Sequence, residues 1–406
     1  MAVGLSRPET LLPVRGVRLS AGCADLYNSR RNDLSIIEVN EGASCAAVFT
    51  TNSFCAAPVN VAQDYLSRTT PRYCLINAGN ANAGTGKQGI ADCISSCQAL
   101  SELTGCAVDK VLPFSTGVIG EYLPVEKICY KMPSLLNSLS SDNWLNVAEA
   151  IMTTDTVPKG VSRTIEIDNQ SITVTGIAKG SGMIKPDMAT MLAFIATDAE
   201  ISKTVLQDIL SHSVNRSFNR ICVDGDTSTN DACVLLATGL GDVSAINSCD
   251  HQYEKIIRDT IADVCIELAK SIIRDGEGAS KFVTIDVCDG VSEAECLKIA
   301  YGIAESPLVK TAFFASDPNW GRILATVGRA DLENLDINGV SIFMDDICVV
   351  EKGERAPLYT ENLGQEVMRK DEITLRIQLA RGLSSAKIWT CDLSNEYVRI
   401  NAEYRT

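Results

Sequence analysis

Strand-like apolar runs alternate with amphipathic helical segments along nearly the whole 406-residue chain, without internal repeats or a low-complexity linker. The segments Cys45–Asn52 and Arg72–Gly79 predict buried strands, and the second ends in a loop of small polar residues. A helix is expected next, because apolar residues recur at helical spacing until Gly105 ends the pattern. This alternation predicts a mixed α/β fold.

A boundary between two domains is expected near residue 280. Residues 254–278 predict a long amphipathic helix that is closed by glycines, and Ser292 with Glu295 forms the capping box of a later helix. Shorter strands dominate the remaining sequence. We therefore expect a large α/β domain over residues 1–280 and a smaller C-terminal α+β domain over residues 281–406.

The charge and hydrophobicity of the chain argue against several classes of partner. The net charge is −15, and no Lys/Arg cluster interleaves with aromatic residues, so we expect no nucleic-acid partner. The N-terminus lacks the apolar core of a signal peptide, and no run approaches the roughly eighteen apolar residues that span a bilayer. We expect an enzyme of the cytoplasm that acts on small molecules and has no membrane partner.

Sixteen cysteines are scattered through the sequence, with no C-x-x-C pair. Most occupy apolar positions, so we expect small buried hydrophobic side chains that stay reduced. Cys93 and Cys97 lie four apart on one predicted helix face, but no further ligands join them. Because His212 and His251 are the only histidines, a zinc site or a Cys/His nucleophile pair is not expected. We predict neither a metal nor a cofactor.

Two loops imitate known ligand motifs. Gly84–Gly89 has the spacing of a dinucleotide fingerprint, but the preceding strand ends too early, and Lys87 is not followed by the Ser or Thr of a phosphate loop. Asp224–Asp231 resembles a calcium loop but lacks the distal glutamate. We interpret the second as a polar loop whose Asp and Thr side chains cap backbone groups.

The segment Lys179–Ala199 runs a glycine-rich turn directly into an apolar strand, and the hydroxyl of Thr190 stands where that strand begins. Thr190 is either a β-branched core residue that bonds nearby backbone or a nucleophile. No histidine is placed to take its proton. Its own α-amine, with an ordinary pKa of about 8, could do so once the bond to Ala189 is broken. The residues alone leave both interpretations open.

This segment resembles the signature of the ornithine acetyltransferases (glutamate N-acetyltransferases) of arginine biosynthesis, which cut themselves before the threonine of the motif. The resemblance covers nearly the whole chain and includes eight further blocks in order: Ala46–Asn52, Asn77–Gly86, Ser115–Pro124, Ile151–Lys159, Phe218–Asp231, Arg274–Lys281, Phe313–Ile323 and Tyr397–Thr406. It implies an αββα sandwich of the N-terminal-nucleophile kind, with the nucleophile between its layers, and a small C-terminal domain whose last residues return to the active site.

The resemblance also implies site residues. Thr190 becomes the nucleophile and, through its freed amine, the base, and self-cleavage gives an α chain ending at Ala189 and a β chain beginning at Thr190. The oxyanion-hole pair falls on Thr116 and Gly117, which offer a hydroxyl and a backbone N–H to a tetrahedral oxyanion. The substrate contacts fall on Thr153, Lys179, Thr190, Glu277, Asn401 and Thr406.

Each contact has a plainer alternative. Lys179 is either a solvated loop lysine or the partner of a substrate carboxylate. Glu277 either follows a helix end or binds a substrate ammonium. Asn401 and Thr406 would ordinarily belong to a frayed tail, but the apolar residues from Tyr397 onward predict a docked strand instead.

The implied reaction is ping-pong transfer of acetyl from N2-acetylornithine to glutamate through an acetyl-threonine. The alternatives are an amidase or aminopeptidase on the same self-cleaving scaffold and a non-enzymatic acidic scaffold with an uncut chain. The sequence leaves open whether acetyl-CoA is also a donor, and an α2β2 assembly rests on the habit of the family. Lys185 and Asp187 depart from the family pattern, which bears on the rate of self-cleavage but removes no reacting group.

Overall fold

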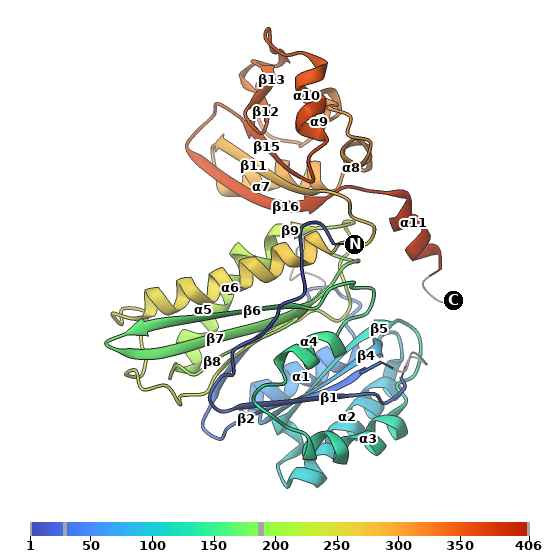
Figure 1. Cartoon of the computed structure of the whole chain (residues 1–406), viewed down its shortest axis with the longest axis vertical. Coiled ribbons are helices and arrows are strands. Elements are labelled where there is room, and N and C mark those ends of the chain that lie inside the picture. Colours follow the sequence, from blue (N-terminus) through green and yellow to red (C-terminus); the bar gives the residue numbers. More distant parts are fainter. Residues whose placement is uncertain (1, 27–30, 186–190, 404–406) are drawn as a thin grey trace.

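Two β-sheets pack face to face in the first part of the chain. The computed structural model describes residues 2–26, 31–185 and 191–403 (Figure 1). The first sheet has the strands β1 (Val17–Gly22), β2 (Leu34–Val39), β4 (Tyr73–Asn80) and β5 (Val111–Val118), in that order. The second has the order β3 (Ser44–Phe49), β10 (Ala232–Ala237), β8 (Leu192–Thr197), β7 (Gln170–Lys179) and β6 (Lys159–Ile167).

The central strands are buried on both faces, which explains their continuous apolar sequences. Every residue of β4, β8 and β10 is buried. One hydrophobic core fills the space between the sheets, and there the ring of Phe114 on β5 meets the ring of Phe194 on β8 edge to face, with centroids 5.1 Å apart. The strand predicted after the glycine-rich turn is therefore confirmed as β8.

Helices cover the outer face of each sheet. Helices α1 (Ala57–Arg68), α2 (Gly86–Thr104) and α3 (Val125–Asn137) lie against the first sheet. Helices α5 (Lys203–Arg216) and α6 (Glu254–Arg274) lie against the second, over a separate core (Figure 1). The short helix α4 (Trp144–Ala150) contacts the edge strands β1 and β6 of the two sheets. The predicted αββα sandwich is confirmed.

A third sheet with its own core forms the C-terminal part of the molecule (Figure 1). Its strands, in order, are β14 (Glu354–Arg355), β13 (Ile347–Glu351), β12 (Ser341–Met344), β15 (Glu372–Gln378), β11 (Phe282–Gly290), β16 (Ser384–Cys391) and β9 (Ile221–Cys222). The helices of this part are α7 (Glu293–Ala304), α8 (Pro307–Phe314), α9 (Trp320–Gly328) and α10 (Glu361–Met368). Because β9 precedes residue 280 in the chain, the sandwich and this sheet are joined by strand pairing as well as by sequence. The domain boundary at residue 280 stays a prediction.

The predicted C-terminal strand is wrong, because residues Asn395–Ala402 form helix α11. The Ser394 hydroxyl accepts from the Tyr397 backbone N–H and caps the first turn. Arg399 then forms ion pairs with Glu396 and Glu403, which are three and four residues away on the helix surface. These helical spacings outweigh the short apolar run that suggested a strand.

Two features of the side chains bear on the sequence predictions. The Ser292 hydroxyl accepts from the Glu295 backbone N–H and so caps α7 as expected, while the Glu295 carboxylate pairs with Arg381. All sixteen cysteines are free thiols, and nine of them are buried.

Within the described ranges, none of the helices combines the length and hydrophobicity that a bilayer crossing requires.

Candidate active site

A cavity of about 270 Å³ lies at the end of the sandwich where β5 and β7 finish. It brings together six residues that the sequence predicted for one site, although they are spread over 285 positions: Thr116, Gly117, Thr153, Lys179, Glu277 and Asn401. The predicted nucleophile Thr190, its neighbour Ala189 and the last residue, Thr406, lie outside the described residues, as does Asp187.

Thr116 and Gly117 lie near the end of β5, where its pairing with β4 becomes irregular. Gly117 has a φ of 134°, and a Cβ atom there would lie 2.2 Å from the carbonyl carbon of Gly79. Only glycine fits this position, because the two backbones approach too closely for a side chain. The glycine thus allows the end of β5 to reach the cavity wall.

Lys179 is the last residue of β7 and pairs with Leu192 at the start of β8. Its side chain is buried, and its ammonium donates to the Thr116 hydroxyl over 3.1 Å. Burial lowers the pKa of Lys179 below its ordinary value, against the attraction of Asp155, Asp231 and Glu277. The ammonium therefore lies in a largely water-free wall of the cavity, within the electrostatic influence of the carboxyl groups of Asp155, Asp231 and Glu277.

Glu277 follows the end of α6 and is 8% exposed. Its backbone N–H donates to the Ser181 carbonyl over 2.8 Å, and its carboxylate accepts from the Asn401 side-chain amide over 2.7 Å. Gly182 packs against it, since a Cβ atom there would lie 2.4 Å from the carboxyl carbon of Glu277. Helix α11 thus reaches the cavity even though it is not the predicted strand.

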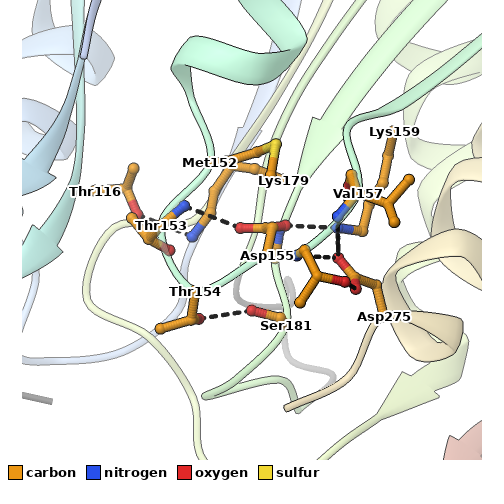
Figure 2. A network of polar contacts seen from close by, with 12 residues as sticks. Thr116, Met152, Thr153, Thr154, Asp155, Val157, Lys159, Lys179, Ser181 and Asp275 are labelled. Atoms are coloured by element: carbon orange, nitrogen blue, oxygen red, sulfur yellow. Dashed lines mark hydrogen bonds and ion pairs between the residues drawn. The ribbon is translucent and has the colours of Figure 1, made fainter. Parts of the chain in front are cut away.

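Thr153 lies in the loop after α4, and a buried polar network holds this loop (Figure 2). The Thr153 N–H donates to Asp155, whose other carboxylate oxygen accepts from Lys159. Burial alone would raise the pKa of Asp155, but the ammonium groups of Lys159 and Lys179 outweigh it and hold the pKa below its ordinary value. Asp155 and Lys159 were not singled out from the sequence, because their partners are fixed only by the loop conformation.

The loop interpreted as polar, Asp224–Asp231, also lines the cavity through Ser228, Thr229 and Asn230. Asn230 donates to the carbonyls of Ala81 and Ser115 and thereby ties this loop to the first sheet. The prediction that its side chains cap backbone groups is confirmed at Asp224, which accepts from the N–H groups of residues 183, 184 and 226. Its role in lining the cavity was missed.

Asp231 closes that loop beside the point where β8 begins. The Ala232 N–H donates to the Met191 carbonyl over 3.0 Å, so Asp231 lies next to the residue that follows Thr190 in the chain. The carboxyl group is buried, and burial raises its pKa well above the ordinary value, although hydrogen bonds from the Met191 N–H and the Ser228 side chain act in the other direction.

The unusual Lys185 forms an ion pair with Glu305 at 3.5 Å.

The arrangement suits recognition of a small molecule that carries both charges. The cavity presents one ammonium, from Lys179, and one carboxylate, from Glu277, and both are mostly withdrawn from solvent. Hydroxyl and amide groups of other residues add to its polar lining: Thr116, Thr153, Thr154, Ser228, Thr229, Asn230 and Asn401. In the described part of the chain, no group of three or more His, Cys, Asp or Glu side chains is arranged to hold a metal ion.

Comparison with known proteins gives a consistent result. The sequence profile of the ArgJ family matches residues 18–406. The arginine biosynthesis bifunctional protein ArgJ of Pseudomonas syringae pv. tomato is 52% identical over 406 residues, which is 100% of both chains. The protein of the same name from Methylococcus capsulatus is 54% identical over 396 residues, covering 98% of this chain and 97% of its own.

A solved structure agrees with these sequence matches. The crystal structure of the arginine biosynthesis bifunctional protein ArgJ from Bacillus halodurans has 37% sequence identity and a TM-score of 0.51, and it covers 53% of this chain and 100% of its own. Since both the profile and relatives at about half identity span almost every residue, the chain belongs to the ArgJ family.

Proposed function

We propose that this protein is a glutamate N-acetyltransferase of arginine biosynthesis, which moves acetyl from N2-acetylornithine to glutamate. The observation that carries the proposal is the meeting of Lys179 and Glu277 in one small cavity beside Thr116 and Gly117. Donor and acceptor are both amino acids, so a pocket that pairs an ammonium with a carboxylate and a carboxylate with an amino group can bind each in turn. The names of the curated relatives, which place them in arginine biosynthesis, support this reading.

In the first half-reaction, the freed amine of Thr190 takes the proton of its own hydroxyl as the oxygen attacks the acetyl carbonyl. The Thr116 hydroxyl and the Gly117 N–H stabilise the oxyanion of the tetrahedral intermediate. Because Lys179 donates to the oxygen of Thr116, the hydroxyl proton of Thr116 stays available for the oxyanion. The carbon–nitrogen bond then breaks, the Thr190 ammonium returns the proton to the departing amine, and ornithine leaves an acetyl ester on Thr190.

The second half-reaction reverses these steps with a different amine. The amino group of glutamate attacks the ester carbonyl, and its proton passes to the Thr190 amine. The carbon–oxygen bond to Thr190 then breaks, and the Thr190 ammonium returns the proton to the departing hydroxyl oxygen. The products are N-acetylglutamate and the regenerated threonine. We propose acetyl-CoA as a second acetyl donor to Thr190, which the word "bifunctional" in the names of the relatives supports. The mechanism needs no metal or bound cofactor.

Self-cleavage before Thr190 is part of this proposal, because the mechanism needs a free amine there. The β chain would hold the 217 residues from Thr190 to Thr406, about 53% of the 406-residue chain. The solved chain from Bacillus halodurans is matched in full by 53% of this chain, a share that fits a separate β chain. Assembly into α2β2 and a cytoplasmic location stay predictions, and native mass measurement tests the first.

The decisive experiment measures the mass of the denatured protein beside a Thr190→Ala variant. By proportion of 43.6 kDa, the wild type should give species of roughly 20 and 23 kDa, because the mechanism requires cleavage before Thr190, while the variant stays whole. A single uncut chain in both proteins would rule out the proposed mechanism. Product analysis then separates transfer from hydrolysis: acetylglutamate is expected from N2-acetylornithine and glutamate, whereas release of acetate alone would identify an amidase.

A further inference from the structure

Three charged side chains form a fully buried cluster beside the cavity. The Lys159 ammonium lies 2.6 Å from Asp155 and 2.7 Å from Asp275, and the side chains are 0%, 0% and 1% exposed, respectively (Figure 2). Removing such charges from water is costly, and well-packed apolar side chains often stabilise a core equally well. Burial of the three charges is therefore weak evidence for a purely stabilising role.

The two carboxylates differ in what else they hold. Asp155 accepts from the Thr153 N–H over 3.0 Å with one oxygen and from the Gly180 N–H over 2.7 Å with the other. Asp275 accepts from the N–H groups of Thr156 and Val157, which do not line the cavity. Asp155 thus joins the loop that carries one proposed substrate contact to the end of the strand that carries another.

Asp155 lies close in sequence to one of the two cavity residues that it connects, and its hydrogen-bond donor Gly180 adjoins the other. Thr153 precedes Asp155 by two residues, and Lys179 immediately precedes Gly180. Both Thr153 and Lys179 line the cavity. A second contact joins the same two segments, because the hydroxyl oxygens of Thr154 and Ser181 lie 2.7 Å apart (Figure 2). The Asp155 carboxylate is therefore the charged member of a clamp across one wall of the site.

We propose that Asp155 is a positioning residue for substrate binding, which fixes the Thr153 backbone at the cavity through the hydrogen bond to its N–H. Lys159 and Asp275 hold the carboxylate in place and balance its charge. The proposal rests on the proposed acetyl transfer and adds a residue that touches no substrate. A shift of the Thr153 loop weakens contacts made in the ground state and the transition state alike, so KM rises while kcat changes little.

Asparagine substitutions separate this role from a general role of the cluster. In Asp155→Asn, the amide oxygen can keep the bonds from Lys159 and Gly180, but the NH2 group then faces the Thr153 N–H, donor against donor. The opposite orientation would create two such conflicts. In Asp275→Asn, the oxygen keeps Lys159 and the two backbone donors, and the NH2 group donates to the Thr156 hydroxyl. Each variant removes one buried negative charge, but only the first loses the contact to Thr153.

The experiment compares wild type, D155N and D275N as fully processed proteins, in steady-state acetyl transfer. We expect D155N to raise KM for both N2-acetylornithine and glutamate about tenfold, with kcat within about threefold, because a buried donor is left unpaired. D275N should keep both KM values within about twofold of wild type. An unchanged KM in D155N, or equal changes in both variants, would overturn the proposal. Absence of acetyl transfer in the wild type would instead refute the proposed function. Failure of the proposed function is therefore distinguishable from failure of the proposal for Asp155.

A second variant and a second measurement keep the proposal testable if D155N does not fold. Asp155→Ser leaves space in place of a donor conflict and should give the same rise in KM. Hydrogen exchange over residues 152–157 needs no activity: we expect faster exchange in Asp155→Ser or D155N than in D275N. Equal protection of these residues in the Asp155 and Asp275 variants would count against the clamp.

Discussion

The Asn401 side-chain amide donates to a carboxylate oxygen of Glu277 over 2.7 Å, across 124 positions of sequence. Asn401 belongs to helix α11, and Glu277 follows helix α6. Since Glu277 is buried and both residues line the cavity, the amide fixes the direction in which the carboxylate faces the cavity. The C-terminal helix therefore completes a site that the sandwich builds only in part.

Asn401→Ala should weaken catalysis without loss of the fold. Removing a hydrogen bond to a charged group costs roughly 1.5–3 kcal/mol, so kcat/KM for acetyl transfer should fall about 10- to 150-fold. Steady-state kinetics of the purified protein measure this change. Val398→Ala is the matched control, because Val398 lies on the same helix and is 63% exposed. Equal activity of the two variants would show that the amide does not hold Glu277 for the reaction.

Much of the secondary structure could be predicted from sequence, because the apolar spacing of the long elements is clear. The period of α6 fits only a helix, and the glycine-rich turn before the apolar run of β8 favours a strand there. The four residues from Tyr397 to Ile400 do not, since so short an apolar run fits either a strand or a helix. The Ser394 cap and the ion pairs of Arg399 with Glu396 and Glu403 favour the helix. A pattern based on apolar residues alone does not include these polar contributions.

The candidate site was predictable only where a motif carried it. Lys179 and Glu277 lie in recognisable blocks, and the structure brings them to one cavity. Lys159 belongs to one of the same blocks, but nothing in the sequence shows that its ammonium meets Asp275, which is 116 positions away. That contact depends on the path of the loop after α4, which no periodicity describes.

Gly182→Ala should impair the site through Glu277. A Cβ atom at residue 182 would lie 2.4 Å from the Glu277 carboxyl carbon, so the carboxylate has to move away from its place in the cavity. Displacement of a binding group by about 1 Å can cost on the order of 100-fold in rate, and we expect a fall of this size in kcat/KM. Because the obstructing atoms end a flexible side chain, the free energy of unfolding should change by less than about 1 kcal/mol.

The matched glycine is Gly302, inside helix α7, where a Cβ atom would meet only an ordinary contact at 3.7 Å. Gly302→Ala should keep full activity and gain roughly 0.5–1 kcal/mol of stability from helix propensity. Kinetics and chemical denaturation of both variants test the pair. Wild-type kcat/KM in Gly182→Ala would mean that Glu277 is not needed where the structure places it.

Lys179 should limit activity at alkaline pH. Burial lowers its pKa below the value of about 10.5 for a free lysine, although Asp155, Asp231 and Glu277 oppose the shift and Lys159 adds to it. As the pH rises through this lowered pKa, the ammonium that donates to Thr116 becomes neutral. We therefore expect kcat/KM to decline at a lower pH than the pH at which ordinary lysines lose their proton.

Lys179→Met tests this assignment through the pH profile as well as through the rate. We expect a loss of about 100-fold in kcat/KM at neutral pH, because the site loses the proposed charged contact to substrate and the donor to Thr116. The residual activity should lack the alkaline decline that the lowered pKa of Lys179 predicts for the wild type. An identical decline in the variant would assign it to another group, such as the amine of a substrate.

Asp231 should make stability depend on pH in the opposite sense to a paired carboxylate. Its buried carboxyl has a pKa raised well above the ordinary value, so the folded state binds a proton that the unfolded state has released. Stability is therefore lost as the pH rises from the unfolded pKa of about 4 towards the raised folded pKa. Asp231→Asn removes this ionisation and should raise the unfolding midpoint at pH 7, with a difference that shrinks towards pH 4.

The measurement uses a Thr190→Ala background, in which the proposed cleavage cannot occur and a single chain unfolds. Asp331→Asn in the same background is the control, because the Asp331 side chain is fully exposed and its removal should leave the midpoint unchanged at every pH. A lower midpoint for Asp231→Asn at pH 7 would show that the ionised carboxylate is stabilising. In that case the N–H of Met191, the Ser228 side chain and the Lys179 ammonium outweigh the cost of its burial.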